Sequence, residues 1–238
     1  MHISKEVESI MDNNELFIEK YKELEYEITK RYKLSKMVSP IPFIEKKNEY
    51  LGFSKELNYC REVRNFLQHE SKIDKGFAVI ASDEMIQKMD EIINAVKNPI
   101  RIKDVYISID KVYYKGLDSY VYPSMVSMDY KKYSHIPILE KRKLVGVFSK
   151  TSIFKYLLEE ENSNFSENIQ FKDIKRYISL DEEYYLFTKK DTPVEDIIEE
   201  VIMNFKNGKR VAIIFVTDNG MKDGNLVGLL TPYDILGL

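Results

Sequence analysis

Two stretches of this sequence, KLVGVFSKTSIF at residues 143–154 and NLVGLLTPYDIL at residues 225–236, have the same order of residue types. In each, an apolar run with one glycine leads to a serine or threonine, and a second apolar run follows. They differ three residues after that hydroxyl, where the second stretch has Asp234 and the first has Ser152. Repetition on this scale indicates a duplicated supersecondary unit that needs its twin to close a hydrophobic core.

The segments around both stretches alternate in the same way between short apolar runs and helical patterns. Runs rich in β-branched and aromatic residues predict extended segments at residues 101–115, 135–139, 143–148, 183–190, 210–216 and 225–230. Periodic apolar patterns predict helices at residues 119–133, 149–160, 192–208 and 231–238. We expect Thr192 to cap the third of these helices, with Pro193 at its first position. The order strand–helix–strand–strand–helix is therefore written twice.

The residues before Pro99 show helical patterns instead. Three apolar stripes predict three helices that lie as antiparallel neighbours. The stripes consist of Leu16, Tyr21, Leu24 and Ile28; of Leu57, Cys60, Val63 and Leu67; and of Met89, Ile92, Ile93 and Val96. Ser82 is the expected N-cap of the third helix, and Pro99 ends it. The sequence therefore predicts an α+β fold, with a helical domain at residues 1–99 and repeated units at residues 100–165 and 166–238.

The composition excludes several classes of protein. No apolar run approaches the roughly 18 residues of a membrane span, so we expect no membrane partner. The single cysteine, Cys60, excludes an internal disulfide framework and fits a reducing, cytoplasmic location. No cysteine or histidine pair has the spacing of metal ligands, so no metal site is expected. The formal net charge of −3 gives no overall attraction to nucleic acid.

The doubled unit resembles a pair of CBS domains, also called a Bateman module, over residues 100–238. The family's most diagnostic string is glycine, two apolar residues, serine or threonine, two variable residues and aspartate. GLLTPYD at residues 228–234 matches this string fully, whereas GVFSKTS at residues 146–152 ends in Ser152. The resemblance implies that two βαββα units form a pseudo-two-fold pair.

The residue types at the second string suit a nucleotide. A strand that ends in a hydroxyl residue and starts a helix presents backbone N–H groups to a phosphate, and Thr231 can donate to it as well. Asp234, one turn later, has acceptor oxygens for both hydroxyls of a ribose, as acidic residues do in dinucleotide-binding folds. A hydroxyl residue followed three positions later by an acid is also an ordinary N-capping arrangement. Both interpretations of Asp234 stay open at this point.

The resemblance to CBS pairs implies an adenosine-containing ligand, such as AMP, ATP or S-adenosylmethionine, in the cleft between the two units. Thr231 and Asp234 would then hold the phosphate and the ribose. The other candidate ligand-binding residues that the resemblance implies are Tyr233, Arg210, Val211, His135, Ile136 and Ser149. His135 is also explained by packing beside a strand. Because the first unit lacks the acid, we expect one dominant nucleotide site.

The helical block contains a second candidate site in REVRNFLQH, with Arg64, Asn65 and His69. This segment resembles the signature of HEPN domains, helical dimers of which many cut RNA without a metal. The resemblance implies that His69 moves a proton of the ribose 2′-hydroxyl and that Arg64 stabilises the phosphate charge. His69 follows Arg64 by five positions, which is about 140° around an ideal helix. The two side chains do not converge unless the helix ends before His69, so the enzyme hypothesis requires a site shared by a homodimer. Ordinary alternatives are a salt bridge for Arg64 and a helix-terminal position for His69.

Two hypotheses follow. In the first, the protein is a non-catalytic sensor: the CBS-like pair binds an adenosine-containing ligand, and the HEPN-like helical domain transmits the signal through the geometry of a homodimer. In the alternative, the helical domain is itself an enzyme, a nucleotide-gated and metal-independent ribonuclease with RNA as its substrate.

Overall fold

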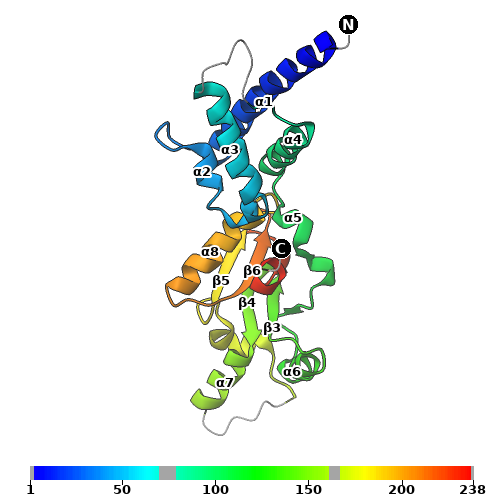
Figure 1. Ribbon diagram of the computed structural model, residues 1–238. Coiled ribbons are helices and arrows are strands. Elements are labelled where there is room, and N and C mark those ends of the chain that lie inside the picture. Colours follow the sequence, from blue (N-terminus) through cyan, green and yellow to red (C-terminus); the bar gives the residue numbers. More distant parts are fainter. Residues whose placement is uncertain (1–2, 70–78, 161–166, 237–238) are drawn as a thin grey trace. The chain divides into compact units, whose positions relative to one another are not determined.

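The computed structural model describes residues 3–69, 79–160 and 167–236 (Figure 1). The chain divides into two compact units, Met1–Pro99 and Ile100–Leu238. The first unit is helical and the second contains two mixed β-sheets with helices. The α+β fold class expected from the sequence is thereby confirmed.

The first unit is built from helices around one apolar core. Its elements are α1 (Ile3–Tyr32), α2 (Pro40–Ile44), the 3₁₀ helix η1 (Asn48–Phe53), α3 (Ser54–His69) and α4 (Asp83–Lys97). Ser82 caps α4 as expected, because its hydroxyl oxygen accepts a hydrogen bond of 3.3 Å from the Met85 N–H. The three apolar stripes of the sequence therefore lie on α1, α3 and α4.

One member of the α1 stripe was wrong. The side chain of Leu16 is 38% exposed, whereas its neighbour Phe17 is fully buried. Phe17 precedes Tyr21 by four residues and Leu24 by seven, which places all three on one helix face. Leu16 lies about 100° away from that face. The other expected members of the three stripes are buried or half-buried.

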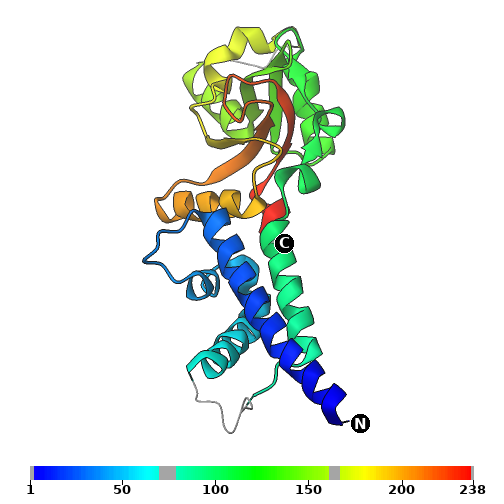
Figure 2. The ribbon, with the colours of Figure 1, turned by 90° about the horizontal axis from the view of Figure 1, so that it is seen from above.

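The expectation of antiparallel neighbours was also wrong for α1 and α4, which run in the same direction (Figure 2). Side-chain contacts between the two helices advance together along both sequences. They join Asn13 to Asp83, Lys20 to Asp90 and Glu23 to Lys97. The chain between these helices includes α3, which runs in the opposite direction (Figure 2), so the two long helices can pack side by side in parallel.

The second unit repeats one order of elements. Its first half contains β2 (Lys115–Gly116), α6 (Val121–Tyr130), β3 (His135–Glu140), β4 (Lys143–Ser149) and α7 (Lys150–Glu159). Its second half contains β5 (Tyr184–Thr188), α8 (Val194–Lys206), β6 (Val211–Thr217), β7 (Leu226–Leu230) and α9 (Pro232–Ile235). In both halves the first strand is parallel to the second, and the second is antiparallel to the third. The βαββα order is therefore present twice.

A shared apolar cluster packs the two sheets of the second unit against each other. Its buried members are Leu139, Leu144 and Val147 from the first sheet and Tyr185, Ile213, Phe215 and Leu226 from the second. Each half also has its own core, formed where its helices cover its sheet. A duplicated unit that leaves one face of its sheet uncovered is completed here by its twin.

Two further segments bring a carbonyl group close to a glycine. The strand β1 (Ile107–Ser108) pairs with β7, and a Cβ added to Gly228 would lie 2.3 Å from the Ile107 oxygen. The 3₁₀ helix η3 (Phe171–Ile178) ends beside β4, where a Cβ added to Gly146 would lie 2.6 Å from the Ile178 oxygen. Both glycines are needed because any side chain would collide with this backbone.

The two approaching segments are themselves a repeat: YISIDKVYY at residues 106–114 and YISLDEEYY at residues 177–185. The strand and helix patterns did not reveal this repeat. The prediction of one extended segment at residues 101–115 was wrong. They form α5 (Ile102–Val105), the short strand β1 and the 3₁₀ helix η2 (Ile109–Lys111). A local contact stabilises the start of α5, because the Asp104 carboxylate accepts a 2.9 Å hydrogen bond from the Arg101 N–H.

The expected start of α8 is shifted by one residue. Pro193, with extended backbone angles, is the capping residue, and the helix begins at Val194. The Thr192 carbonyl oxygen accepts a 2.9 Å hydrogen bond from the Ile102 N–H. Backbone pairing with the segment around Ile102 therefore holds Thr192 outside the helix.

Alanine at either close-approach glycine is expected to destabilise the protein. Gly228→Ala and Gly146→Ala should each lower the free energy of unfolding by about 1–3 kcal/mol, because the added methyl group meets a backbone oxygen that cannot turn aside. The matched control is Gly116→Ala, whose Cβ would lie 3.8 Å from the Leu139 oxygen. Urea unfolding of the three variants measures the difference, and equal midpoints for all three would contradict the prediction.

Candidate functional site

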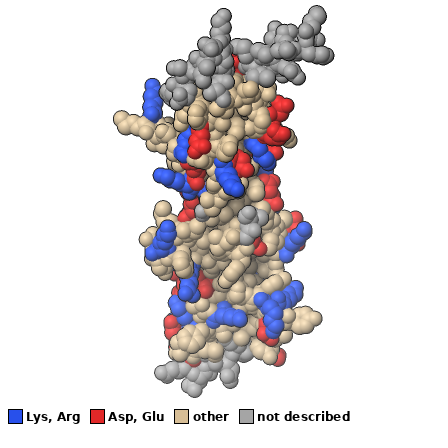
Figure 3. All heavy atoms as spheres, viewed as in Figure 1, with Lys and Arg blue, Asp and Glu red and all other residues tan. Residues whose placement is uncertain are grey.

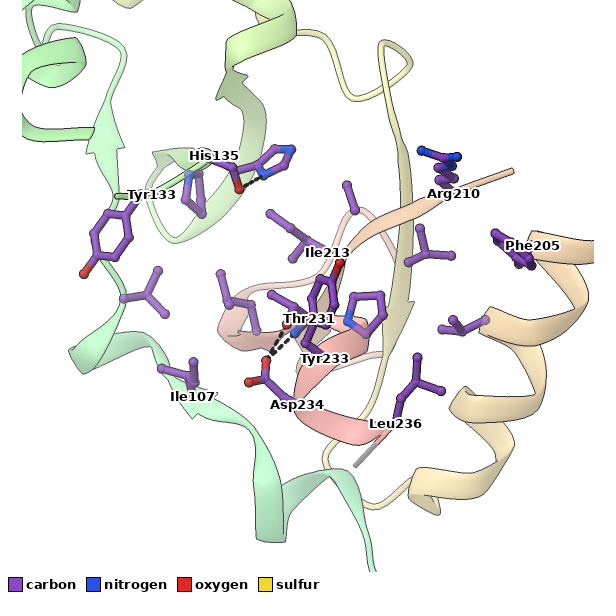
Figure 4. Close-up of a pocket in the computed structure, with 18 of the residues that line it drawn as sticks. Ile107, Tyr133, His135, Phe205, Arg210, Ile213, Thr231, Tyr233, Asp234 and Leu236 are labelled. Atoms are coloured by element: carbon purple, nitrogen blue, oxygen red, sulfur yellow. Dashed lines mark hydrogen bonds between the residues drawn. The ribbon is translucent and has the colours of Figure 1, made fainter. Parts of the chain in front are cut away.

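A cavity of about 1070 Å³ opens in the second unit where strands end and helices begin (Figure 4). Its walls come from β1, the end of η2 and the residues after it, the start of β3, the last two turns of α8, the start of β6, and the end of β7 with the residues after it. Most lining side chains are apolar or aromatic, and they include Ile107, Tyr133, Ile213 and Leu229. The cavity is therefore a concave, largely apolar site with polar groups at its edge, as small-molecule sites usually are.

Thr231 and Asp234 lie at one edge of this cavity and contact each other (Figure 4). The Oδ2 atom of Asp234 accepts hydrogen bonds from the backbone N–H of Thr231 at 2.6 Å and from its hydroxyl at 2.8 Å. Asp234 thus makes the expected capping contact with Thr231, and it does so through one carboxylate oxygen. Its other carboxylate oxygen takes no part in these two bonds, and the side chain is exposed.

The same contacts limit what this corner offers to a phosphate. Pro232, the first residue of α9, has no N–H group, and the Thr231 N–H already donates to Asp234. The Thr231 hydroxyl donates to Asp234 as well. Few donors remain at the start of a helix only four residues long. A phosphate in the cavity must therefore be held mainly by side chains from elsewhere.

Basic side chains from several elements bring positive charge to the edge of the cavity. Lys111, Lys132, Lys206 and Arg210 all line the cavity, and Asp234 is the one acidic residue among the lining residues that the structure describes. We call these four the basic rim. Only Arg210 was a candidate from the sequence. The missed signal is that basic pairs precede both β3 and β6, as Lys131–Lys132 and Lys209–Arg210.

The structure places the remaining candidates in two groups. Tyr233, Val211 and Arg210 line the cavity, and Tyr233 is 92% exposed. Ile136 and Ser149 are not among the described lining residues, and both are buried within the first half of the unit. Ile136 follows the lining residue His135 along a strand, and successive side chains of a strand point to opposite faces.

His135 lines the cavity, but its ring points away from Asp234 (Figure 4). Its Nε2 atom lies 3.0 Å from Oε2 of Glu183, and its Nδ1 atom lies 2.8 Å from the Ser134 hydroxyl. Glu183 also accepts hydrogen bonds from the Thr151 hydroxyl at 3.0 Å and the Tyr185 hydroxyl at 2.9 Å. The hydrogen bond with His135 is the main reason that the pKa of Glu183 is lowered to about 2. The described polar contacts of the His135 ring are therefore with Ser134 and Glu183, and its role as a ligand-binding residue stays a prediction.

The candidate ribonuclease residues lie on α3. The Arg64 guanidinium contacts the Asn65 side-chain oxygen at 3.3 Å and lies 5.8 Å from the centre of the Tyr21 ring. His69 is the last residue of α3, and its side chain lies outside the described residues. Basic and acidic side chains are interspersed on the face seen in Figure 3. The HEPN-type ribonuclease, its RNA substrate and its homodimer stay predictions.

No helix among the described residues is both long and apolar enough to cross a lipid bilayer. In residues 3–69, 79–160 and 167–236, no three histidine, cysteine or acidic side chains gather closely enough to hold a metal ion.

Comparison with known proteins identifies one segment by sequence. A model of the CBS domain family matches residues 125–159, which run from α6 through β3 and β4 to α7. No curated protein matches the chain. The matched segment contains the first of the two repeated strand-to-helix stretches, with Ser149 and Ser152.

Several solved structures are similar to part of this chain at low identity. A CBS domain-containing protein of unknown function from Bacillus anthracis shares 24% identity, covers 58% of this chain and 91% of its own, and has a TM-score of 0.43. A CBS domain pair in complex with 5′-methylthioadenosine and S-adenosyl-L-methionine shares 18% identity over 59% and 95%, with a TM-score of 0.41. The CBS domain of a bacterial CNNM/CorC family Mg²⁺ transporter in complex with ATP shares 15% identity over 62% and 91%, with a TM-score of 0.42.

Removing the charge of Glu183 is expected to destabilise the protein in a pH-dependent way. The pKa of Glu183 is about 2 in the folded protein against an ordinary value of 4.5, so ionised Glu183 stabilises the fold above pH 4.5. That contribution is lost as the pH falls from 4.5 towards 2. Glu183→Gln should lower the free energy of unfolding by on the order of 1–3 kcal/mol above this range.

Urea unfolding at a series of pH values measures this effect. The gap between the wild type and Glu183→Gln should shrink as the pH falls below 4.5. Glu140→Gln, at the exposed end of β3, removes the same charge without these hydrogen bonds and is the matched control. A gap of constant size across the whole series would contradict the prediction.

Proposed function

We propose that this protein is a regulatory sensor whose second unit is a CBS-domain pair that binds an adenosine phosphate in the cavity beside Asp234. One observation carries the proposal: an exposed carboxylate, a basic rim and apolar walls meet around a single cavity of about 1070 Å³. A ribose, a phosphate chain and a purine base need these three surroundings together. The match of residues 125–159 to the CBS domain family supports the same interpretation.

The carboxylate of Asp234 suits the ribose. One of its oxygens is already held by Thr231, which fixes the orientation of the group. The other oxygen can accept hydrogen bonds from ribose hydroxyls, because an ionised carboxylate has about four acceptor positions. The capping contact therefore positions the side chain for binding and does not compete with it.

The apolar part of the cavity suits the base. Ile213, Leu229 and Val211 line one part of it, and the rings of Tyr113 and Tyr133 lie near each other with their centres 5.9 Å apart. Aromatic and branched side chains bury a purine face, and backbone groups at the start of β6 supply hydrogen bonds to its edge.

The basic rim suits more than one phosphate. The described lining residues include four cations and one carboxylate, and among the four only Lys132 forms an ion pair with a described residue, Asp129 at 3.2 Å, so the cavity attracts anions. Arg210 adds a planar guanidinium that binds phosphate oxygens through two donors. We therefore propose a nucleotide with several phosphates, such as ATP, in preference to the positively charged sulfonium of S-adenosylmethionine.

A ligand of this kind can transmit a signal through the shape of the second unit. The cavity is lined by residues of both repeated halves, including Lys132 from the first half and Asp234 from the second. A ligand that contacts both halves favours the arrangement that it binds more tightly, and this differential affinity shifts the population. We propose that the helical unit passes the shift on within a homodimer.

Asp234→Asn is expected to weaken nucleotide binding by about 10- to 100-fold, the usual effect of losing a charged hydrogen-bond partner. Asparagine retains an oxygen for the contact with Thr231, so the fold should be preserved. Isothermal titration with ATP, ADP and AMP measures the change. Asp196→Asn, an exposed aspartate on α8 outside the cavity lining, is the matched control. Equal affinities for the wild type and Asp234→Asn would overturn the proposed ribose contact.

Arg210→Gln is expected to reduce the affinity for ATP by roughly 3- to 10-fold while leaving that for adenosine unchanged, because the rim acts on phosphates. The loss should diminish at high salt, since exposed charges are screened. Lys175→Gln, an exposed lysine outside the cavity lining, is the control. Tighter binding of S-adenosylmethionine than of ATP by the wild type would contradict the proposed charge preference.

A further inference from the structure

The second unit contains two strand-to-helix corners of the same construction. We call residues 228–234 the Thr231 corner and residues 146–152 the Ser149 corner. In the Thr231 corner the N–H of Thr231 donates to Asp234, and in the Ser149 corner the N–H of Ser149 donates to the Ser152 hydroxyl at 3.1 Å. The backbone is thus held in the same way, but only the Thr231 corner faces the cavity described above.

The repeat at residues 106–114 and 177–185 determines what lies in front of each corner. The Ile107 carbonyl meets Gly228 in the Thr231 corner, and the Ile178 carbonyl meets Gly146 in the Ser149 corner. Lys111 and Val112 follow Ile107 by four and five residues, and Glu182 and Glu183 follow Ile178 by the same numbers. The two pairs therefore occupy equivalent positions in the repeat. The first pair lines the open cavity, and the second pair is acidic.

The Glu183 carboxylate binds groups of the Ser149 corner. Its Oε1 atom accepts from Thr151, which stands in register with the cavity residue Tyr233. Its Oε2 atom contacts His135, which is opposite Ser149 in the β3–β4 pairing. The Glu183 side chain is 22% exposed and that of His135 is 18% exposed, so protein covers most of this contact.

We propose that Glu183 is a built-in occupant of the Ser149 corner, so that its carboxylate holds the position of a ligand's anionic group and each chain binds one nucleotide. This inference rests on the proposed function of the Thr231 corner. A nucleotide entering the Ser149 corner would have to displace the contacts of Glu183 with Thr151 and His135. It would also meet a second carboxylate, that of Glu182, where the open cavity has a lysine.

The charge of Glu182 is partly neutralised by its ion pair with Lys155. The carboxylate of Glu183 is instead directed at His135, Thr151 and Tyr185. Its contacts come from β3, α7 and β5, so one side chain ties three elements of the two halves together. Glu183 therefore has a structural reason to stay in place when nucleotide is present.

The number of nucleotides bound per chain tests this inference. Isothermal titration of the full chain with ATP should give about one binding step for the wild type, and Asp234→Asn should weaken that step without revealing another. Glu183→Val, which introduces the residue found at Val112 in the open cavity, should add a second and weaker step. Combining it with Ser152→Asp, which restores the missing acid, should strengthen that second step by about 10-fold or more.

Glu183→Gln keeps the side chain in the corner and is the matched control, for which one step is expected. Two steps in the wild type would overturn the inference, and so would a single step in both Glu183→Val and the Glu183→Val, Ser152→Asp double variant. The wild-type count does not depend on whether these variants fold. Failure of the proposed function has a different signature, the absence of any step in the wild type. In that case a binding step that appears only after Glu183→Val would still support Glu183 as an internal occupant. The absence of any binding step in both variants would overturn that inference.

Discussion

The approach of a backbone carbonyl to a glycine, once in each half of the second unit, is the constraint on which the rest of the site depends. The Ile107 carbonyl lies against Gly228, and the Ile178 carbonyl lies against Gly146. Because glycine has no Cβ, β1 can lie close beside β7, and the end of η3 can lie close beside β4. The residues four and five positions later are then held in front of the strand-to-helix corner, and they decide what the corner faces.

Those residues make the two halves chemically different although their folds are alike. Lys111 and Val112 leave an apolar wall and a positive charge beside the cavity. Glu183 instead satisfies its carboxylate within the protein, through His135, Thr151 and Tyr185. A half-buried carboxylate such as that of Glu183 is kept ionised by partners of this kind. On our proposals, the same corner therefore binds a ligand in one half and stabilises the fold in the other.

The sequence predicted the fold well wherever local periodicity and packing agree. The predictions of the apolar stripe of α4 and of its Ser82 cap were correct, because the buried face of an amphipathic helix appears in the sequence as apolar residues at helical spacing. The Thr231–Asp234 contact was foreseen as a cap. The parallel packing of α1 and α4 was not foreseen, because an apolar stripe does not indicate whether the helix packed against it runs parallel or antiparallel. The prediction of an extended segment at residues 101–115 was wrong, because the short helix α5 forms there despite the high β propensity of these residues.

The sequence by itself determined the duplicated βαββα order, the glycine of each corner and the loss of the acid at Ser152, because all three follow from residue type and spacing. Only the tertiary structure decided which side chains meet at each corner. Lys111, Lys132 and Lys206 are far apart in the chain, and they gather around one cavity through the pairing of strands. The same pairing brings Glu183 to His135. Strand register and the close approach at glycine are long-range contacts, and no local pattern encodes them.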